Sequence, residues 1–320
     1  MSLQKIEYIL QHLDDKEEWS VQLLRIKNPR NSSTVYAARD IALYPEGALL
    51  EFVKAVKKYY LEGSNAKIRQ YEDVHQYDGT AMSTIIYKLP SNHELIAHEY
   101  LGLNDCLAES QTDGNPFDFA ANAFVLSGII YLPQQYCDDI HSEGYDASVR
   151  LICLQNPVSV LKHKFLYDEG TFREIKDKVL SIRPFFDVLI IEDSVYMLTL
   201  AGEKLFNMER SYKAICSDKV FEIEHKGIIN DPGTFSNVAH SGQNPRKFTA
   251  FRDDYFARLV EYPEDRLRIS QRYGIPMSGD QFDTTTEDGS RKLIKFVCGK
   301  GMRDAFEDIP VEVDGTRPWK

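Results

Sequence analysis

Eight cationic side chains in the last quarter of the chain are the residues whose types and spacing best suit the binding of an anion. They are Arg246, Lys247, Arg252, Arg268, Arg272, Arg291, Lys292 and Lys295. The first three alternate with Phe248 and Phe251, and rings beside cations suit phosphate contacts next to a stacking surface. We therefore treat the eight residues as a candidate binding surface for a polyanion.

A predicted helix that begins at Pro263 carries two of these cations. Proline is favoured at the first helical position, and the helix is expected to run to Tyr273. Arg268 and Arg272 then lie on one face at i, i+4. A pairing of Arg268 with Glu264 on a solvated helix is an equally good interpretation.

The last predicted helix, Arg291–Cys298, is expected to be capped by Ser290 and closed by Gly299. Its apolar side chains lie opposite its cations; they are Leu293, Ile294 and Val297. Arg291 and Lys292 fall in the first turn, where the helix dipole disfavours positive charge by several tenths of a kcal/mol. This placement indicates that the charge is kept for an external anion.

A metal-dependent nuclease is the alternative chemistry. Such a site needs an acidic residue and a Glu-x-Lys pair on adjacent strands, which together hold a divalent cation and activate water. Asp168 and Glu169 precede the triplet Glu174-Ile175-Lys176, and Glu222 precedes a second triplet, Glu224-His225-Lys226. Triplets this short arise by chance in charged stretches. The first cluster is the better candidate of the two.

Two histidines resemble a zinc-protease motif without matching it. His93 and His98 are separated by i, i+5, whereas a helix brings two zinc ligands together at i, i+4. We also find no glycine loop for phosphate, no nucleophile elbow and no cysteine–histidine pairing. The sequence therefore predicts no catalytic residue, no metal site and no cofactor.

Composition places the chain among ordinary globular proteins, with 43% hydrophobic and 27% charged residues in 320. The longest apolar stretch, Ala123–Leu132, has half the length of a bilayer-spanning helix, so we expect no direct membrane insertion. Met1–Ile6 does not read as the start of a signal peptide. The five cysteines are scattered and odd in number, which favours a reducing cytoplasm over a disulfide framework.

The net charge of −11 is unevenly distributed. Residues 1–240 carry all of it, and residues 241–320 sum to zero. An acidic protein repels nucleic acid at long range. If the chain binds DNA, it must do so through a local basic face, and the neutral C-terminal quarter is where that face is expected.

The hydrophobic pattern predicts a mixed α+β fold: a mixed sheet that contains a β-hairpin, flanked by helices, in two lobes. The hairpin is expected at Asp187–Ile191 and Val195–Leu200, and a helix near Glu203–Ser217 follows it. That helix should bury Leu205, Phe206 and Met208. A polar stretch between two further predicted strands, Ala123–Leu132 and Ser148–Gln155, divides the lobes into residues 1–143 and 144–320.

The order of a buried hairpin and a helix with Phe206 near its start resembles the KwaB-like proteins. This bacterial family is named for the second component of the Kiwa antiphage defence system. The resemblance covers residues from about 146 to 300 and also includes Ser148–Gln155, His163–Tyr167 and Leu293–Phe296. The chain departs from the family pattern after Cys298, where Gly-Lys-Gly-Met replaces an Asn-Asp pair and a short helix.

The resemblance implies a cytoplasmic subunit that binds phage DNA and docks on a small multi-span membrane partner, KwaA. It implies a homodimer or a higher homo-oligomer at the inner face of the cell membrane, and it implies no hydrolysis. The hypothesis from the sequence is therefore a non-catalytic defence protein that binds double-stranded DNA without sequence specificity and blocks replication or transcription of phage DNA. A metal-dependent nuclease and a purely scaffolding subunit are the alternatives.

Overall fold

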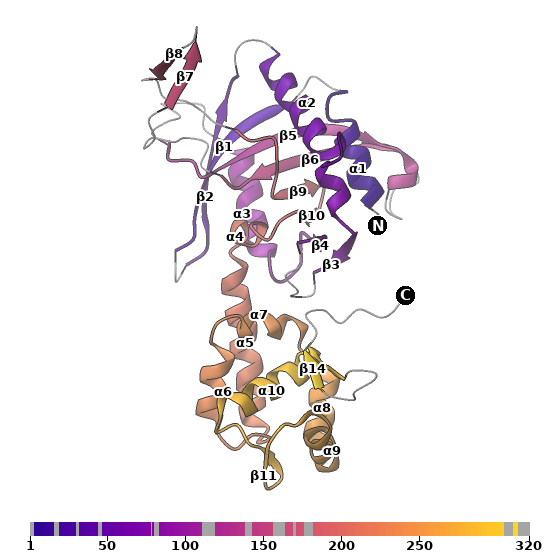
Figure 1. Cartoon of the computed structure of the whole chain (residues 1–320), viewed down its shortest axis with the longest axis vertical. Helices are drawn as coiled ribbons and strands as arrows, with labels where there is room; N and C mark the ends of the chain where they lie inside the picture. The colour runs from indigo at the N-terminus through magenta and orange to yellow at the C-terminus, as the bar shows by residue number, and fades with distance from the viewer. Residues whose placement is uncertain are drawn as a thin grey trace. The chain divides into compact units, whose positions relative to one another are not determined.

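The chain forms two units, described here from a computed structural model (Figure 1). Unit 1 comprises Met1–Gln76 and Ser83–Asn207, and unit 2 comprises Tyr77–Met82 and Met208–Lys320. The structure describes residues 3–15, 19–29, 32–43, 47–77, 79, 83–110, 119–137, 143–155, 164–168, 171–175, 182–303 and 310–312. For residues 164–168, 171–175, 301–303 and 310–312 it describes the backbone alone.

An eight-stranded sheet forms the centre of unit 1. In their order across the sheet, the strands are β2 (Val35–Ile41), β1 (Ser20–Lys27), β5 (Ala123–Leu132), β6 (Tyr145–Cys153), β9 (Val188–Ile191), β10 (Ser194–Met197), β4 (Ile85–Pro90) and β3 (Asp73–Gln76). The β3–β4 pair is parallel, and the other neighbours are antiparallel. The predicted α+β class, with a mixed sheet that contains a hairpin, is confirmed.

Helices cover both faces of this sheet (Figure 1). On one face, α1 (Leu3–Gln11) and α2 (Ala48–Leu61) pack with Phe124, Leu126 and their neighbours into the main core. On the other face lies α3 (Ala97–Ala108), whose Leu107 carbonyl accepts a hydrogen bond from the Gln22 amide of β1. Because successive side chains of a strand point to opposite faces and helices cover both faces, the central strands need apolar side chains on both faces. Two short 3₁₀ helices also belong to this unit, η1 (Lys67–Gln70) and η3 (Gln134–Tyr136).

The predicted hairpin forms β9 and β10, joined at Glu192 and Asp193. Glu192 has φ 49°, so this tight turn uses the left-handed conformation. Leu205, Phe206 and Met208 are buried, as predicted. The following helix, however, is divided into α4 (Gly202–Leu205) and α5 (Met208–His225). Asn207 lies between them with φ 47°, a conformation that ends a helix, so the prediction of one continuous helix is wrong.

The boundary between the units lies at Asn207–Met208 and not between residues 143 and 144. The strands on either side of the predicted boundary, β5 and β6, are hydrogen-bonded neighbours from Phe124–Cys153 to Leu132–Tyr145. A polar stretch therefore marked the connection of two adjacent strands rather than a division between lobes.

Unit 2 is mainly helical. Its elements after α5 are α6 (Pro232–Ala239), α7 (Asn244–Lys247), η4 (Phe248–Ala250), α8 (Asp253–Glu261), α9 (Pro263–Tyr273), β11 (Met277–Ser278), β12 (Gln281–Phe282), α10 (Glu287–Val297), β13 (Gly301–Arg303) and β14 (Pro310–Glu312). The core of the unit gathers apolar side chains of α5, α6, α8 and α10 around Phe235 and Phe282. The predicted helix from Pro263 to Tyr273 is confirmed as α9.

A short segment from the first third of the chain, Tyr77–Met82, belongs to unit 2. The Tyr77 ring stacks on the Tyr212 ring of α5 with centroids 6.4 Å apart, and the two hydroxyls are hydrogen-bonded. A Cβ at Gly79 would collide with the Thr249 hydroxyl, so this position has room only for glycine. Unit 2 is therefore built from two separate pieces of sequence.

The remaining described strands, β7 (Lys164–Asp168) and β8 (Thr171–Ile175), form an antiparallel hairpin. None of the helices in the described ranges combines the length and the apolar character that a bilayer crossing requires.

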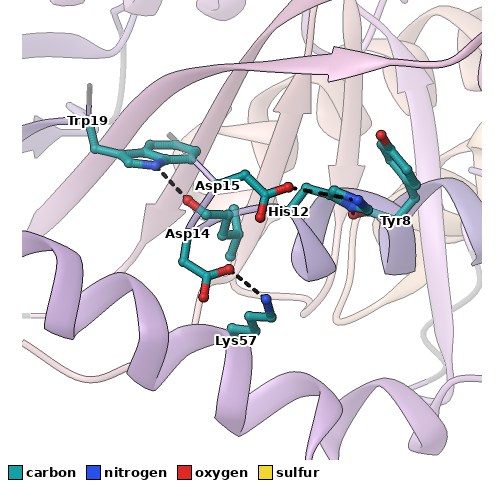
Figure 2. A network of polar contacts seen from close by, with 7 residues as sticks. Tyr8, His12, Asp14, Asp15, Trp19 and Lys57 are labelled. Carbon is teal, nitrogen blue, oxygen red and sulfur yellow. Dashed lines mark hydrogen bonds and ion pairs between the residues drawn. The ribbon is translucent and has the colours of Figure 1, made fainter. Parts of the chain in front are cut away.

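A polar network fixes the end of α1 to its neighbours (Figure 2). The Trp19 indole N–H donates to the Leu13 carbonyl at 2.7 Å, and Lys57 Nζ of α2 donates to Asp14 Oδ1 at 2.5 Å. His12 Nδ1 donates to the Tyr8 carbonyl at 2.7 Å, and its ring stacks on Tyr8. The Trp19 bond gives the Leu13 carbonyl a partner just after the helix end, and the Trp19 and Lys57 bonds tie the end of α1 to the start of β1 and to α2.

The hydrogen bond from Lys57 holds the pKa of the Asp14 carboxyl below its usual value. A depressed carboxyl pKa stabilises the fold at pH values above the ordinary pKa of about 4, and the stabilisation is lost as the pH falls through the folded-state value. The Lys57→Met variant should therefore lower the free energy of unfolding at pH 7 by up to about 1 kcal/mol, and the difference should vanish near pH 2. Urea unfolding at a series of pH values measures it.

Lys58→Met is the matched control, because Lys58 is the next residue of α2, is exposed and is not among the groups that shift the pKa of Asp14. It should leave the acid dependence unchanged. A constant difference between Lys57→Met and the unmodified protein across this pH range would contradict the assigned role of the Asp14–Lys57 pair.

Candidate nucleic-acid interface

Local ion pairs neutralise at least four of the predicted cations. The pairs are Arg252–Asp254, Arg268–Asp265, Arg291–Glu287 and Lys292–Asp288, with nitrogen–oxygen distances of 2.7 to 2.8 Å. The pairing of Arg268 occurs at i, i−3 with Asp265, not with Glu264 as the sequence alternative held. The prediction that all eight cations form one strip of uncompensated charge is therefore wrong for these four.

The aromatic residues beside the first cations are core residues rather than a stacking surface. Phe248 is buried, and its ring stacks on that of Phe251, with centroids 6.2 Å apart. Arg246 is half-buried, and its guanidinium carbon lies 5.7 Å and 5.9 Å from the ring centroids of Tyr77 and Tyr212. The alternation of rings and cations thus serves the packing of unit 2.

Three of the predicted cations converge on one hollow of about 300 Å³ in unit 2. It is lined by Ser241, Gly242, Gln243, Asn244, Lys247, Arg291 and Lys295. No carboxylate is among these lining residues, and three of them are cations. Such a set can accept a phosphate or another polyatomic anion through charge-assisted hydrogen bonds.

The turn between α6 and α7 forms one wall of the hollow. The Ser241 hydroxyl and the Asn244 side-chain amide both donate to the Val238 carbonyl at 2.8 Å. Gly242 has φ 54°, a left-handed conformation that glycine adopts without strain. Helix α7 begins at Asn244 and carries Lys247. The turn residues Ser241, Gly242 and Gln243 were missed by the sequence prediction, although a Ser-Gly-Gln-Asn-Pro run is a turn signal.

Helix α10 forms the other wall. Leu293, Ile294 and Val297 are buried, as predicted, so Arg291 and Lys295, at i and i+4, lie on one side of the helix. The helix is held against α6 and α7 by this apolar face, and Lys247 meets the two α10 cations for that reason. Lys292 lies outside the lining and pairs with Asp288.

The start of α10 differs from the prediction. Its N-cap is Thr286, whose hydroxyl accepts a hydrogen bond from the Gly289 N–H at 3.2 Å, and not Ser290. Glu287 and Asp288 therefore occupy the first turn, where the helix dipole favours negative charge. Ser290 is buried and donates to the Thr284 carbonyl. Arg291 and Lys292 therefore lie beyond the first turn, so the prediction of an external anion from cations placed there is wrong.

The Arg291–Glu287 pair leaves Arg291 accessible to a ligand. Their side chains are 57% and 70% exposed, and exposed ion pairs of this kind contribute about 0–1 kcal/mol. A phosphate that binds two or three cations at once can displace such a carboxylate, because it exchanges one weak contact for several. The hollow is therefore a usable anion site despite this pair.

The structure brings few of the residues of the alternative nuclease sites together. Asp168 and Glu174 lie on the backbone hairpin β7–β8, and Glu169 and Lys176 lie outside the described residues. The second triplet is helical rather than on a strand: Glu222 and Glu224 belong to α5, where Glu222 binds Lys219, and Lys226 follows the helix end. No group of three or more histidine, cysteine or acidic residues in the described ranges is placed to hold a metal ion.

The two histidines of the rejected zinc motif lie in different elements. His93 precedes α3 in a turn, and His98 lies in the first turn of that helix. Burial lowers the pKa of His93 and raises the pKa of Cys153 and of Cys216 to about 12. These two thiols are therefore protonated at neutral pH, and a protonated thiol is a poor nucleophile.

No protein-family model, curated protein or solved structure matches this chain. The resemblance to KwaB-like proteins therefore stays a prediction from the sequence.

The position of α10 depends on its N-cap. Thr286→Ala removes the acceptor for the Gly289 N–H and should lower the free energy of unfolding by about 1 kcal/mol. Thr286→Ser keeps the hydroxyl and should retain most of the stability. Chemical denaturation of both variants measures the effect. Equal stability of the two variants would show that Thr286 does not cap this helix.

Proposed function

We propose that the protein binds double-stranded DNA through its phosphate backbone, largely without sequence specificity, and that the hollow of unit 2 is the main contact. The observation that carries the proposal is the convergence of Lys247, Arg291 and Lys295 on one space with no carboxylate in its described lining. A protein with a net charge of −11 needs such a local site, since its overall charge opposes the approach of a polyanion.

The chemistry of the three cations favours phosphate over bases. Lysine contacts an anion as a point charge, and arginine offers a planar fork that matches two phosphate oxygens. Contacts of this kind position a protein on a duplex but carry no sequence information. A hollow lined by two lysines and one arginine is therefore expected to bind many sequences equally.

The resemblance to KwaB-like proteins extends the proposal to a defence role. A subunit that holds phage DNA, and is itself held by a small multi-span membrane protein, would obstruct replication or transcription of that DNA. Self-association as a homodimer or higher homo-oligomer would add cations to the same duplex, because each copy brings its own hollow.

A combined Lys247→Gln, Arg291→Gln and Lys295→Gln variant tests the contact. Binding of a labelled duplex of mixed sequence is measured by fluorescence anisotropy between about 50 and 200 mM salt. The slope of log affinity against log salt should fall in magnitude by about 2–3, because each lost phosphate contact contributes about 0.9. Affinity for a second, unrelated sequence should fall equally.

The matched control removes the same charge from cations outside the lining: Arg252→Gln, Arg268→Gln and Lys292→Gln. These three residues lie outside the lining of the hollow, so their loss should change the salt slope much less. An equal loss in both triple variants would assign binding to net charge and refute the hollow. Absence of duplex binding by the unmodified protein at physiological salt would favour a scaffolding role.

The same reactions with magnesium or manganese distinguish binding from cleavage. Supercoiled plasmid recovered after incubation should remain intact. Nicking that disappears in Lys176→Ala would overturn the non-catalytic assignment in favour of a nuclease around Asp168 and Glu174.

A further inference from the structure

Unit 1 carries a second hollow, of about 480 Å³, on the α3 face of its sheet. Its lining includes Trp19, Ser20, Ser127, Ile129, Ser148 and Arg150. Ligand sites in proteins commonly enclose about 300–1,000 Å³ and combine apolar walls with a few polar groups. The volume and the mixed lining both fall within that description.

Strand register places the polar groups in one row. Ser20 of β1 lies opposite Ser127 of β5, and Ser127 lies opposite Arg150 of β6. Ser148 lies in the next row, opposite Ile129. Central strands usually carry large β-branched or aromatic residues, so three serines here leave space that larger side chains would fill. The hollow is thus a direct result of small residues at matching positions on three adjacent strands.

Arg150 gives this space a positive charge. Its guanidinium donates to the Asn104 side-chain oxygen of α3, which orients it, and it lies opposite Ile190 of β9. No carboxylate is among the residues of the described chain that line the hollow. The nearby Asp40 carboxylate is bonded by the Gln22 amide at 2.9 Å and by the Ser110 hydroxyl at 2.6 Å, and it is not part of the lining.

Ile129 and Leu107 form the apolar part of the lining. Ile129 is 52% exposed although it lies on a central strand, and Leu107 closes the side toward α3. The Trp19 ring occupies the place of a side chain at Gly128 on the opposite, core-facing side of the sheet, so it supports the floor of the hollow from behind. An exposed isoleucine beside a guanidinium suits a ligand with both an apolar body and an anionic head.

We propose that this hollow binds a small organic anion, whose carboxylate or phosphate head contacts Arg150 and the serine hydroxyls and whose flat apolar body lies against Ile129 and Leu107. This site is independent of the DNA contact in unit 2. Its polar groups are donors of the kind that recognise both head groups, so the two sources share one chemistry.

The test uses the full-length chain and isothermal titration calorimetry. Benzoate and phenyl phosphate present the two head groups on the same ring, and benzamide is the neutral control. At least one of the two anions should give a saturable heat of binding, and benzamide should not. The anion that binds more tightly identifies the head group.

Arg150→Gln should weaken the tighter probe at least tenfold, Arg150→Lys should weaken it less, and Ser127→Val should block it by filling the space. Arg69→Gln, an exposed arginine of the same unit, is the matched control and should leave binding unchanged. If Arg150→Gln fails to fold, as judged by its thermal transition, Arg150→Lys and Ser127→Val decide.

The proposal is overturned if neither anion gives a saturable change, if benzamide binds equally well, or if Ser127→Val and the Arg150 variants bind as the parent does. The triple variant of the unit 2 hollow should titrate like the parent with both anions. Loss of DNA binding and loss of probe binding are therefore separate results, and either can fail without the other.

Discussion

The pairing of β5 with β6 is the constraint on which unit 1 depends. These two long strands lie at the centre of the sheet, and their register from Phe124–Cys153 to Leu132–Tyr145 decides which side chains meet each layer of helices. Phe124 and Leu126 face the core with α1 and α2, while Ser127 and Arg150 face the hollow near α3. A slip by one residue would exchange the two sets, burying a guanidinium in the core.

In unit 2, one face of helix α10 packs in the core and another carries the cations of the hollow. The apolar face of α10 is inserted into the core, so the positions of its cations follow from its helical period and not from any attraction between them. Arg291 and Lys295 consequently meet Lys247 of α7, whereas Lys292, one residue away from Arg291, reaches only Asp288. Adjacent residues of like charge can thus have different functions.

Sequence patterns predicted the parts of the fold that depend on local periodicity. Strand Ala123–Leu132 follows from a continuous apolar run, helix Pro263–Tyr273 from proline at its first position, and the buried Leu205 and Phe206 from the apolar residues of the segment after the hairpin. The start of α10 was misplaced because Thr286 and Ser290 are both good cap residues, and tertiary contacts of Ser290 decide between them.

The candidate site was predictable only as a list of cations. Whether a cation faces a ligand or a carboxylate depends on neighbours brought together by packing, such as Lys247 and Lys295, which are distant in sequence. The boundary between the units was missed for a related reason: strand pairing across a polar connection leaves no mark in the local pattern. The left-handed backbone conformation of Asn207, which follows α4, also cannot be predicted from a hydrophobicity profile.

The membership of Tyr77 and Gly79 in unit 2 has a consequence for how this chain can be divided or inherited. A fragment that begins at Met208 lacks the ring that stacks on Tyr212 and the glycine that fits against Thr249. Recombination at Asn207 would therefore transfer an incomplete core to a new host protein. The helical part is therefore not a self-contained tail, because its packing includes Tyr77 and Gly79 from a distant part of the sequence.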